Sequence, residues 1–477
     1  MAMLLAVMEV IALSWGALTF GAVYPWGYWP LIGASAAVGV LAVLFVRSRV
    51  RGLWRVAASL AAVAAVIGLQ LIKVPAMVIA RVSPLRDAFL KRYDVLYATQ
   101  STSGSHALSM NPGGTLVALS CFAAFSLLLL ATARIASVRG VARQIARGIA
   151  VFGLGLALFA LAQNLALDNQ AGEGHTILIY GIWPDPYVNK PFGPFINKNN
   201  YAGWMLMAMP LAVGYVGASM TRLWRSVRPD GRSRLLALSS KDGANAVLAA
   251  IAALVMGVSI IVSMSRSGMI ALAATMVGVA WFAPASESAR RGRGARLGVA
   301  AAALLVLVAW SGADTIRNRF EDRTDASIRG RLIAWQNAER MVREFPIAGL
   351  GFNAFKTAMT LDQQGDSENF WEEVHNDYLQ IAAEGGLIGL AVVITAIVVV
   401  VVEIRRRFAA ESSARSGAWL RAGAVAGLCA IAVQEIVEFS LQIPANAALF
   451  AVLMGIALHD PPRAAARAPR MMADARR

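Results

Sequence analysis

Four short polar motifs interrupt an otherwise apolar sequence, and they hold the side chains best suited to chemistry. They are centred on Asn199, Arg266, Arg331 and His375. Polar groups at membrane depth are costly, so in a chain this apolar each motif is a candidate functional site. Together they offer one proton acceptor and several donors for an anion. The sequence has no phosphate-binding Gly-rich loop, no CxxC and no HExxH, and its four histidines are scattered, so no metal and no cofactor are expected.

His375 lies in the motif VHNDYLQ at residues 374–380. Histidine is the side chain best suited to proton transfer near neutral pH, so His375 could deprotonate a hydroxyl group. The nearby carboxylates of Glu372, Glu373 and Asp377 could orient the ring or raise its pKa. A capping or solvated histidine fits the same local sequence.

Two arginines are candidates for binding phosphate. Arg266 lies in SRSG at 265–268, between two apolar runs, near or below the level of the lipid headgroups. It could hold the phosphate of a lipid-linked substrate, because a guanidinium group matches phosphate geometry, or it could snorkel to headgroups. Arg331 opens an expected amphipathic helix, with Trp335 one turn along on the same side. It is either a second phosphate clamp or part of a solvated face.

The fourth motif, FINKNNYAG at 195–203, opens an apolar run. Asn199 or Asn200 could cap the helix that begins there. A helix N-terminus also favours an anion, and Lys198 would add to that attraction. Capping and interface anchoring alone explain the motif equally well.

Two further carboxylates, Glu435 and Glu438, interrupt the last apolar segment. They are expected on one helix face near the outer end of a span, because they are three residues apart. They could pair with Arg266 or another cation. Alternatively they mark a proton path, which would make the protein a multi-span secondary transporter.

The elements that position these motifs are membrane spans. Of the 477 residues, 58% are hydrophobic and 15% charged, and the net charge is +16. Mean hydropathy is +0.58. Soluble domains carry about 25% charged residues, so this composition excludes a typical soluble nucleic-acid binder and predicts an all-α integral membrane protein. About twelve transmembrane helices are expected, two within residues 1–46, a final hairpin at 422–458, and others at 56–72, 116–133, 148–167, 201–220, 244–264, 268–285, 297–313 and 385–402.

Loop charges give an orientation. With the N-terminus placed in the cytoplasm, the cytoplasmic segments hold 28 Lys and Arg residues and the short outer loops hold 7. The positive-inside rule therefore predicts that both termini are cytoplasmic. Most of the surplus positive charge then orients the protein, and Arg266 and Arg331 belong to the minority on the outer side.

One outer loop is long enough to fold by itself. Residues 314–384 carry 8 basic and 13 acidic residues. Leu332, Trp335, Ala338 and Val342 predict one face of an amphipathic helix that Pro346 ends, and a second helix is expected from near Trp371. The expected domains are a transmembrane bundle of about nine helices at 1–313, a helical cap at 314–384, about three transmembrane helices at 385–460, and a basic, disordered cytoplasmic tail at 461–477.

The motifs, in their chain order, resemble the O-antigen ligase and polymerase family of bacterial inner-membrane glycosyltransferases. The matching pieces are NKNNYAGWM, SRSG, GRLIAWQNAERMVREFPIAGLGFNAF, VHNDYLQIAAEGGLIG and VEFSLQIPANAALFAVLMGI. They cover residues 195–460, whereas the first 190 residues match only as generic spans. Each piece is weak alone, and the ordered set is more specific.

The resemblance implies a GT-C-like, all-helical glycosyltransferase. Its donor would be a glycan on undecaprenyl diphosphate, and the glycan would pass to a sugar hydroxyl at the periplasmic face without metal or nucleotide sugar. The acceptor would be lipid A-core in a ligase, or a second lipid-linked glycan in an O-antigen or exopolysaccharide polymerase. His375 would be the general base, and Arg266, Arg331 and Lys198 would bind the diphosphate. Supporting roles would fall to Asn199, Asn376, Tyr378 and Trp335.

Overall fold

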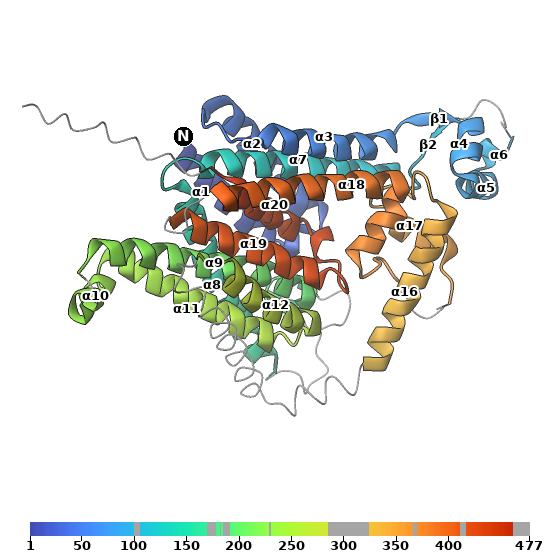
Figure 1. The fold of residues 1–477 in the computed structure, drawn as a ribbon. Helices are drawn as coiled ribbons and strands as arrows, with labels where there is room; N and C mark the ends of the chain where they lie inside the picture. The colour runs from blue at the N-terminus through green and yellow to red at the C-terminus, as the bar shows by residue number, and fades with distance from the viewer. Residues whose placement is uncertain are drawn as a thin grey trace, which may run out of the picture.

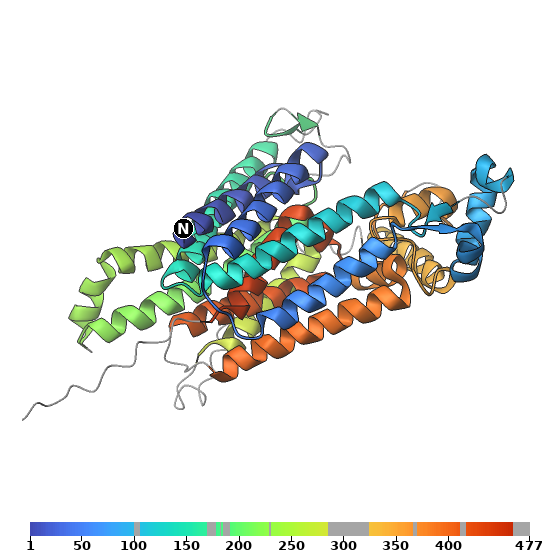
Figure 2. The ribbon, with the colours of Figure 1, turned by 90° about the horizontal axis from the view of Figure 1, so that it is seen from above.

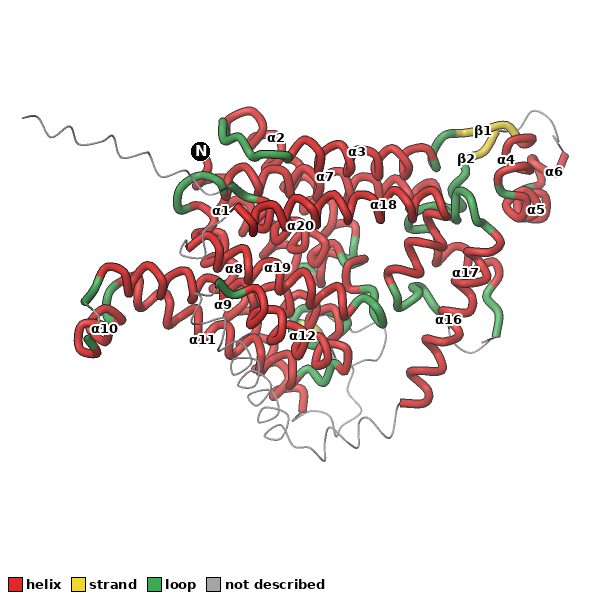
Figure 3. Tube along the Cα trace, in the orientation of Figure 1, coloured by secondary structure: helices red, strands yellow, loops and turns green. Residues whose placement is uncertain are grey.

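The computed structural model is an all-helical bundle in which strands are few and short (Figure 3). It describes residues 1–99, 105–168, 178–181, 183–184, 191–228, 230–284, 324–365, 370–410 and 416–460. The expected span at 297–313 and the expected tail at 461–477 lie outside the described residues. Two antiparallel pairs of strands join β1 (Lys73–Pro75) to β2 (Ser105–Ala107) and β3 (Leu178–Ile179) to β4 (Trp183–Pro184).

Apolar helices form the body of the protein. Seven described helices are long and apolar enough to cross a membrane, and four shorter apolar helices accompany them. The expectation of an all-α multi-pass membrane protein is therefore confirmed. The long helices are α2 (Pro25–Phe45), α7 (Pro112–Ala136), α8 (Val141–Asp168), α9 (Lys198–Ser226), α11 (Lys241–Val262), α18 (Asp377–Ala410) and α19 (Ser416–Gln434), and the shorter ones are α1 (Ala2–Leu18), α3 (Leu53–Leu69), α12 (Arg266–Phe282) and α20 (Pro444–Leu458).

Helix α9 is the candidate span most enclosed by protein, and it packs against α8, α11, α12 and α19. Glycines allow the backbones of α9 and α19 to approach closely. A Cβ atom at Gly423 would lie 2.4 Å from the carbonyl oxygen of Pro210, and one at Gly214 would lie 2.6 Å from that of Trp419. This packing brings the start of α9 and the end of α19 to the same end of the bundle.

A folded cap lies at the end of the bundle opposite α10 (Gly231–Leu238), as Figures 1 and 2 show. Part of it, residues 73–111, was expected to form short outer loops, and that expectation is wrong. These residues form β1, β2 and three short helices. Their anchor is distant in sequence, because the Met110 amide donates to the carbonyl of Leu350 at 2.8 Å. The cap helices are α4 (Ala76–Val82), α5 (Pro84–Tyr93), α6 (Val95–Thr99), α16 (Thr324–Glu344) and α17 (Phe355–Asp362).

Apolar side chains of both stretches pack together inside the cap. The predicted amphipathic helix exists as α16 and ends before Pro346, but its buried face differs from the expected one. Leu332 is 46% exposed, whereas Ala334, Ala338 and Met341 are buried. Leu85 and Phe89 of α5 pack on the same cluster. We therefore propose a cap made of the described residues within 73–111 and 324–376, in place of 314–384 alone.

The second expected cap helix begins later than predicted. Residues 371–376 are not helical, and α18 starts at Asp377. The reason is local, because the Asn376 side chain accepts a hydrogen bond from the Leu379 amide at 3.0 Å and so caps the helix. Helix α18 is itself broken at Gly386, which has φ 60° and ψ −169°. Two helical segments of different direction therefore meet at this glycine.

The turn after α16 docks on this break. The amides of Leu387 and Ile388 donate to the carbonyls of Pro346 and Ile347 at 2.7 and 3.4 Å. Gln70, just after α3, donates to the carbonyls of Ala348 and Glu384 at 2.8 and 2.9 Å. Membrane helices therefore hold the end of α16 directly, which fixes where the cap stands on the bundle.

Replacing Gly386 with alanine should loosen the cap. The φ/ψ values of Gly386 are accessible essentially only to glycine, and an added Cβ would lie 2.5 Å from the Ile347 carbonyl oxygen. We expect Gly386→Ala to destabilise the protein by about 1–3 kcal/mol, measured as a lower thermal midpoint of the purified protein. Gly155→Ala on α8 is the control, because nothing lies within 4 Å of its added Cβ. Equal midpoints for the two variants would contradict the strain argument.

Candidate functional site

The start of α9 contributes amide groups to the site. Asn197 caps the helix, since its side chain accepts from the Asn199 amide at 2.8 Å. The cap is thus Asn197, whereas Asn199 or Asn200 was expected. The Asn199 side chain is not used as the helix cap, and its nitrogen donates to Glu438 Oε1 at 2.8 Å. Gln434 donates to the backbone carbonyl of Asn199 at 2.9 Å, which joins α9 to the end of α19.

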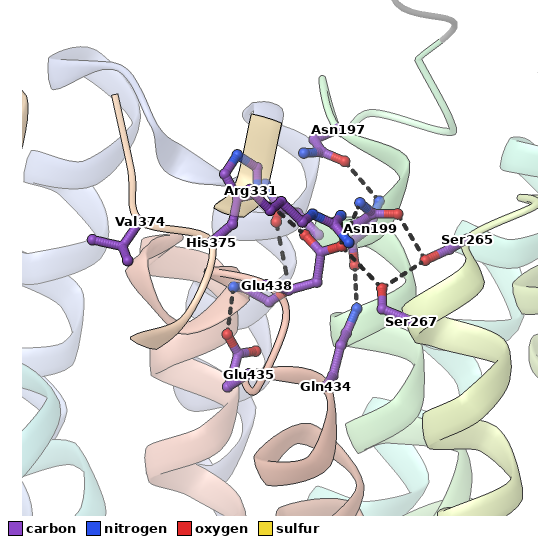
Figure 4. Close-up of polar contacts among 12 residues, drawn as sticks. Asn197, Asn199, Ser265, Ser267, Arg331, Val374, His375, Gln434, Glu435 and Glu438 are labelled. Carbon is purple, nitrogen blue, oxygen red and sulfur yellow. Dashed lines mark hydrogen bonds and ion pairs between the residues drawn. The ribbon is translucent and has the colours of Figure 1, made fainter. Parts of the chain in front are cut away.

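The SRSG motif forms the adjacent helix start, seen beside α9 in Figure 4. Ser265 caps α12 by accepting from the Gly268 amide at 3.1 Å, and its hydroxyl donates to Asn199 Oδ1 at 2.8 Å. The Ser267 hydroxyl donates to Glu438 Oε1 at 3.1 Å. Arg266 is the first residue of α12, so its neighbours on both sides belong to this hydrogen-bond network.

Glu438 lies at the centre of the network, in the turn between α19 and α20. Helix α19 ends at Gln434, so Glu435 and Glu438 do not share a helix face as expected. The short helical turn η2 (Ser440–Gln442) follows them. The Glu438 side chain is 1% exposed. A carboxylate this deeply buried requires compensating donors, and its Oε1 atom receives three of them.

Arg331 provides the charged donor. It extends from α16 of the cap, and its Nη2 atom lies 2.6 Å from Glu438 Oε1. The sequence left open whether Glu438 pairs with Arg266 or with another cation. In the structure it pairs with Arg331. One face of the cap is therefore fastened to the α19–α20 turn by an ion pair. The Arg331 side chain remains 23% exposed, so an anion from solvent can reach it.

His375 lies on the other side of the same carboxylate. Its Nδ1 atom is 3.8 Å from Glu438 Oε2, beyond hydrogen-bond distance, and neither atom has a hydrogen-bond partner within the described chain. The ring makes edge contacts with Phe439 at 4.7 Å and Trp371 at 5.8 Å between centroids. Its backbone has φ 56°, an uncommon value for a residue other than glycine. Packing therefore fixes the ring beside the carboxylate (Figure 4).

The remaining predicted residues surround this centre. Trp335 Nε1 donates to the His375 carbonyl at 3.4 Å, which links α16 to the histidine loop. The Tyr378 hydroxyl donates to the Ala432 carbonyl at 2.7 Å and ties α18 to α19, while the residue as a whole is 46% exposed. Asn376 is occupied with capping. Lys198 is the first residue of α9, directly before Asn199.

The carboxylates near His375 in sequence do not face it as expected. Asp377 accepts from Gln442 at 3.1 Å, and Glu373 accepts from Gln380 at 2.5 Å. The carboxylate that faces the ring is Glu438, from a turn far along the chain. The sequence showed it only as an acidic residue interrupting an apolar segment. Across the described ranges no group of three His, Cys, Asp or Glu side chains is placed to hold a metal ion.

The fold and the site define a multi-pass membrane protein with a polar centre beneath a helical cap. Comparison with known families agrees with this. Residues 251–394 match the family model described as O-antigen ligase, so this stretch is a domain of the O-antigen ligase family, and the resemblance found in the sequence is confirmed. The matched residues include Arg266, Arg331 and His375 and end before Glu438. No curated protein matches the chain.

Glu373 should make the stability of the cap depend on pH. Burial raises the pKa of its carboxyl to about 8, and the charges of neighbouring carboxylates add to the shift. The folded protein then keeps a proton on Glu373 that the unfolded chain releases near pH 4.5, so stability falls as pH rises between these values. We expect the thermal midpoint of the wild type to fall relative to that of Glu373→Gln between pH 5 and pH 8. Parallel profiles would contradict the raised pKa.

Proposed function

We propose that this protein transfers a glycan from undecaprenyl diphosphate to a sugar hydroxyl at the periplasmic face of the bacterial inner membrane. The family match supports a lipid-linked glycan transferase. The observation that carries the detailed proposal is the meeting of Arg331 and His375, from separate elements, at one buried carboxylate. A cation suited to binding phosphate and a side chain suited to accepting a proton lie together at the capped end of the bundle, which supports such a transfer.

The chemistry would proceed without metal or nucleotide sugar. Because Glu438 faces Nδ1 of His375, the ring nitrogen left for the acceptor is Nε2. Nε2 takes the proton of the acceptor hydroxyl while the hydroxyl oxygen bonds to the anomeric carbon of the donor. The bond from that carbon to the diphosphate oxygen breaks, and the lipid diphosphate leaves with the electron pair. Arg331, Arg266 and Lys198 stabilise the charge that develops on it.

We further propose that the capped end is periplasmic and that both termini are cytoplasmic. The distribution of basic residues supports this orientation, since the expected cytoplasmic segments hold 28 of the 44 Lys and Arg residues. The cap lies at the opposite end from α10, which belongs to one of those basic segments (Figure 1). Donor and acceptor would both reach the site from the outer leaflet.

The transporter hypothesis relied on Glu435 and Glu438 as a proton path. In the structure Glu438 is held by Arg331, Asn199 and Ser267. Glu435 accepts from the Ser440 amide at 2.7 Å. These contacts favour a fixed site over a conducting path. A transporter would show flux in proteoliposomes that Glu438→Gln removes and that His375 substitutions leave unchanged.

Removing the proposed base or either arginine should abolish transfer. We expect His375→Ala, Arg331→Ala and Arg266→Ala each to lower the rate by roughly 10²-fold or more, while the protein still inserts. Product is measured by gel analysis of lipid-linked glycan with purified protein in nanodiscs. Arg343→Ala is the matched control on α16, because this arginine is 72% exposed and pairs only with Glu339 among the described residues. Full activity of His375→Ala would refute the assignment of the base.

The acceptor should be identified by supplying one substrate at a time. The protein is incubated with a lipid-linked repeat unit, with and without lipid A-core. The LQIPANA segment at 441–447 and the length of the chain favour a polymerase of exopolysaccharide or capsule. We therefore expect a ladder of chain lengths without core. A product that forms only when core is present would identify a ligase instead.

A further inference from the structure

The two oxygens of the buried Glu438 carboxylate have very different surroundings. Oε1 receives hydrogen bonds from Arg331, Asn199 and Ser267 at 2.6, 2.8 and 3.1 Å. Oε2 is buried, and no hydrogen bond to it is found in the described chain. Buried carboxylate oxygens are rarely left in this state, so an unpaired one points to a partner that binds in another state of the protein.

His375 is a candidate hydrogen-bond donor for Oε2. Its Nδ1 atom is also buried without a hydrogen bond in the described chain, and it lies 3.8 Å from Oε2. A movement of about 1 Å would bring the two atoms to hydrogen-bond distance. Nδ1 of His375 and Oε2 of Glu438, a possible donor and an acceptor without hydrogen bonds in the described chain, thus face each other. Arg331 meanwhile holds the Glu438 carboxylate through Oε1.

We propose that Glu438 serves two hydrogen-bond donors in turn, holding Arg331 in the resting protein and pairing with the Nδ1–H group of neutral His375 once the donor diphosphate has taken Arg331. This inference rests on the proposed function, since it assigns the diphosphate to Arg331. Glu438 is a positioning residue here, because it acts through Arg331 and His375 and does not touch the substrate.

The exchange keeps the buried carboxylate hydrogen-bonded throughout. When Arg331 turns to the diphosphate, it gives up its hydrogen bond to Glu438. In return it gains an anion that can accept two parallel hydrogen bonds from its guanidinium group. Glu438 keeps Asn199 and Ser267 on Oε1 and gains His375 on Oε2. The carboxylate then holds the proton on Nδ1, leaves the Nε2 lone pair for the acceptor hydroxyl, and stabilises the imidazolium that forms. Binding of the donor thereby prepares the base for the acceptor.

Other charged groups near His375 are engaged elsewhere or set back from it. Glu373 accepts from Gln380 and Asp377 accepts from Gln442, on the loop and helix that carry the histidine. Glu435 accepts from the Ser440 amide. Further charged residues at this end of the bundle include Glu372 on the histidine loop, Lys356 on α17, which pairs with Glu372, Glu384 on α18, and Lys198 and Arg266 at the starts of α9 and α12.

A double-mutant cycle read by NMR tests the exchange. The full-length protein is labelled with [¹⁵N]histidine in nanodiscs, the His375 signal is assigned with His375→Gln, and its pKa is followed in the wild type, Arg331→Gln, Glu438→Gln and the double variant. Loss of Arg331 should free Glu438 and strengthen proton binding at His375 on the order of tenfold. When Glu438 is already replaced by glutamine, Arg331→Gln should strengthen proton binding at His375 by less than a third as much. Equal effects in both backgrounds would show that Arg331 acts on His375 directly and would overturn the proposal.

Undecaprenyl diphosphate without a glycan is the second probe. Its own charge should raise the pKa of His375 in every variant, but the rise should be larger in the wild type than in Glu438→Gln. The matched control is Glu435→Gln, another buried carboxylate of the same turn, which should keep the wild-type response. A response in the wild type no larger than that in Glu438→Gln would also overturn the exchange.

The failure of this proposal can be told apart from failure of the proposed function. The mutant cycle uses no glycan, whereas transfer is measured separately with a glycan-bearing donor. Absence of transfer together with intact coupling between Arg331 and Glu438 would reject the glycosyltransferase alone. Transfer that depends on His375, without coupling in the cycle, would reject the exchange alone.

Discussion

A carboxylate enclosed by protein at the end of a membrane bundle must be neutralised by groups brought to it, and Glu438 is such a carboxylate. Its donors come from the starts of α9 and α12 and from the cap helix α16. The three donor residues, Asn199, Ser267 and Arg331, lie more than 60 residues from one another along the chain. The need to compensate one buried charge therefore fixes how two membrane helices and the cap meet, and it places the arginine and the histidine within reach of the same point.

The second constraint is the attachment of the cap to the bundle. Glu384 receives the amides of Asn353, Ala354 and Phe355 at the start of α17, at 2.9 to 3.2 Å. The break at Gly386 lies two residues further on and receives the turn that ends α16. Helix α18 is thus both a membrane span and the base on which the cap stands. Arg331 can contact Glu438 only because α16 is held at this angle.

The sequence predicts the parts of this structure that depend on local pattern. Apolar runs located the spans, the spacing of α16 predicted a helix, and residue type alone singled out Arg331 and His375. Contacts between residues far apart along the chain could not be predicted from the sequence. The fold of residues 73–111 depends on the turn at Leu350, and the carboxylate that faces His375 comes from the α19–α20 turn. The late start of α18 reflects the side-chain cap by Asn376, which competes with the helical pattern that begins at Trp371.

The site joins residues made early in synthesis to residues made late, and this affects how the protein is assembled in the membrane. Residues 73–111 and the start of α9 are synthesised long before Glu438, and contacts between segments so far apart form slowly. Helices can enter the membrane one after another, but Arg331 and Asn199 have no carboxylate to meet until the final hairpin, α19 and α20, has been made. Completion of the last two spans is therefore the step at which Glu438 can first meet the donors that come from α9, α12 and α16.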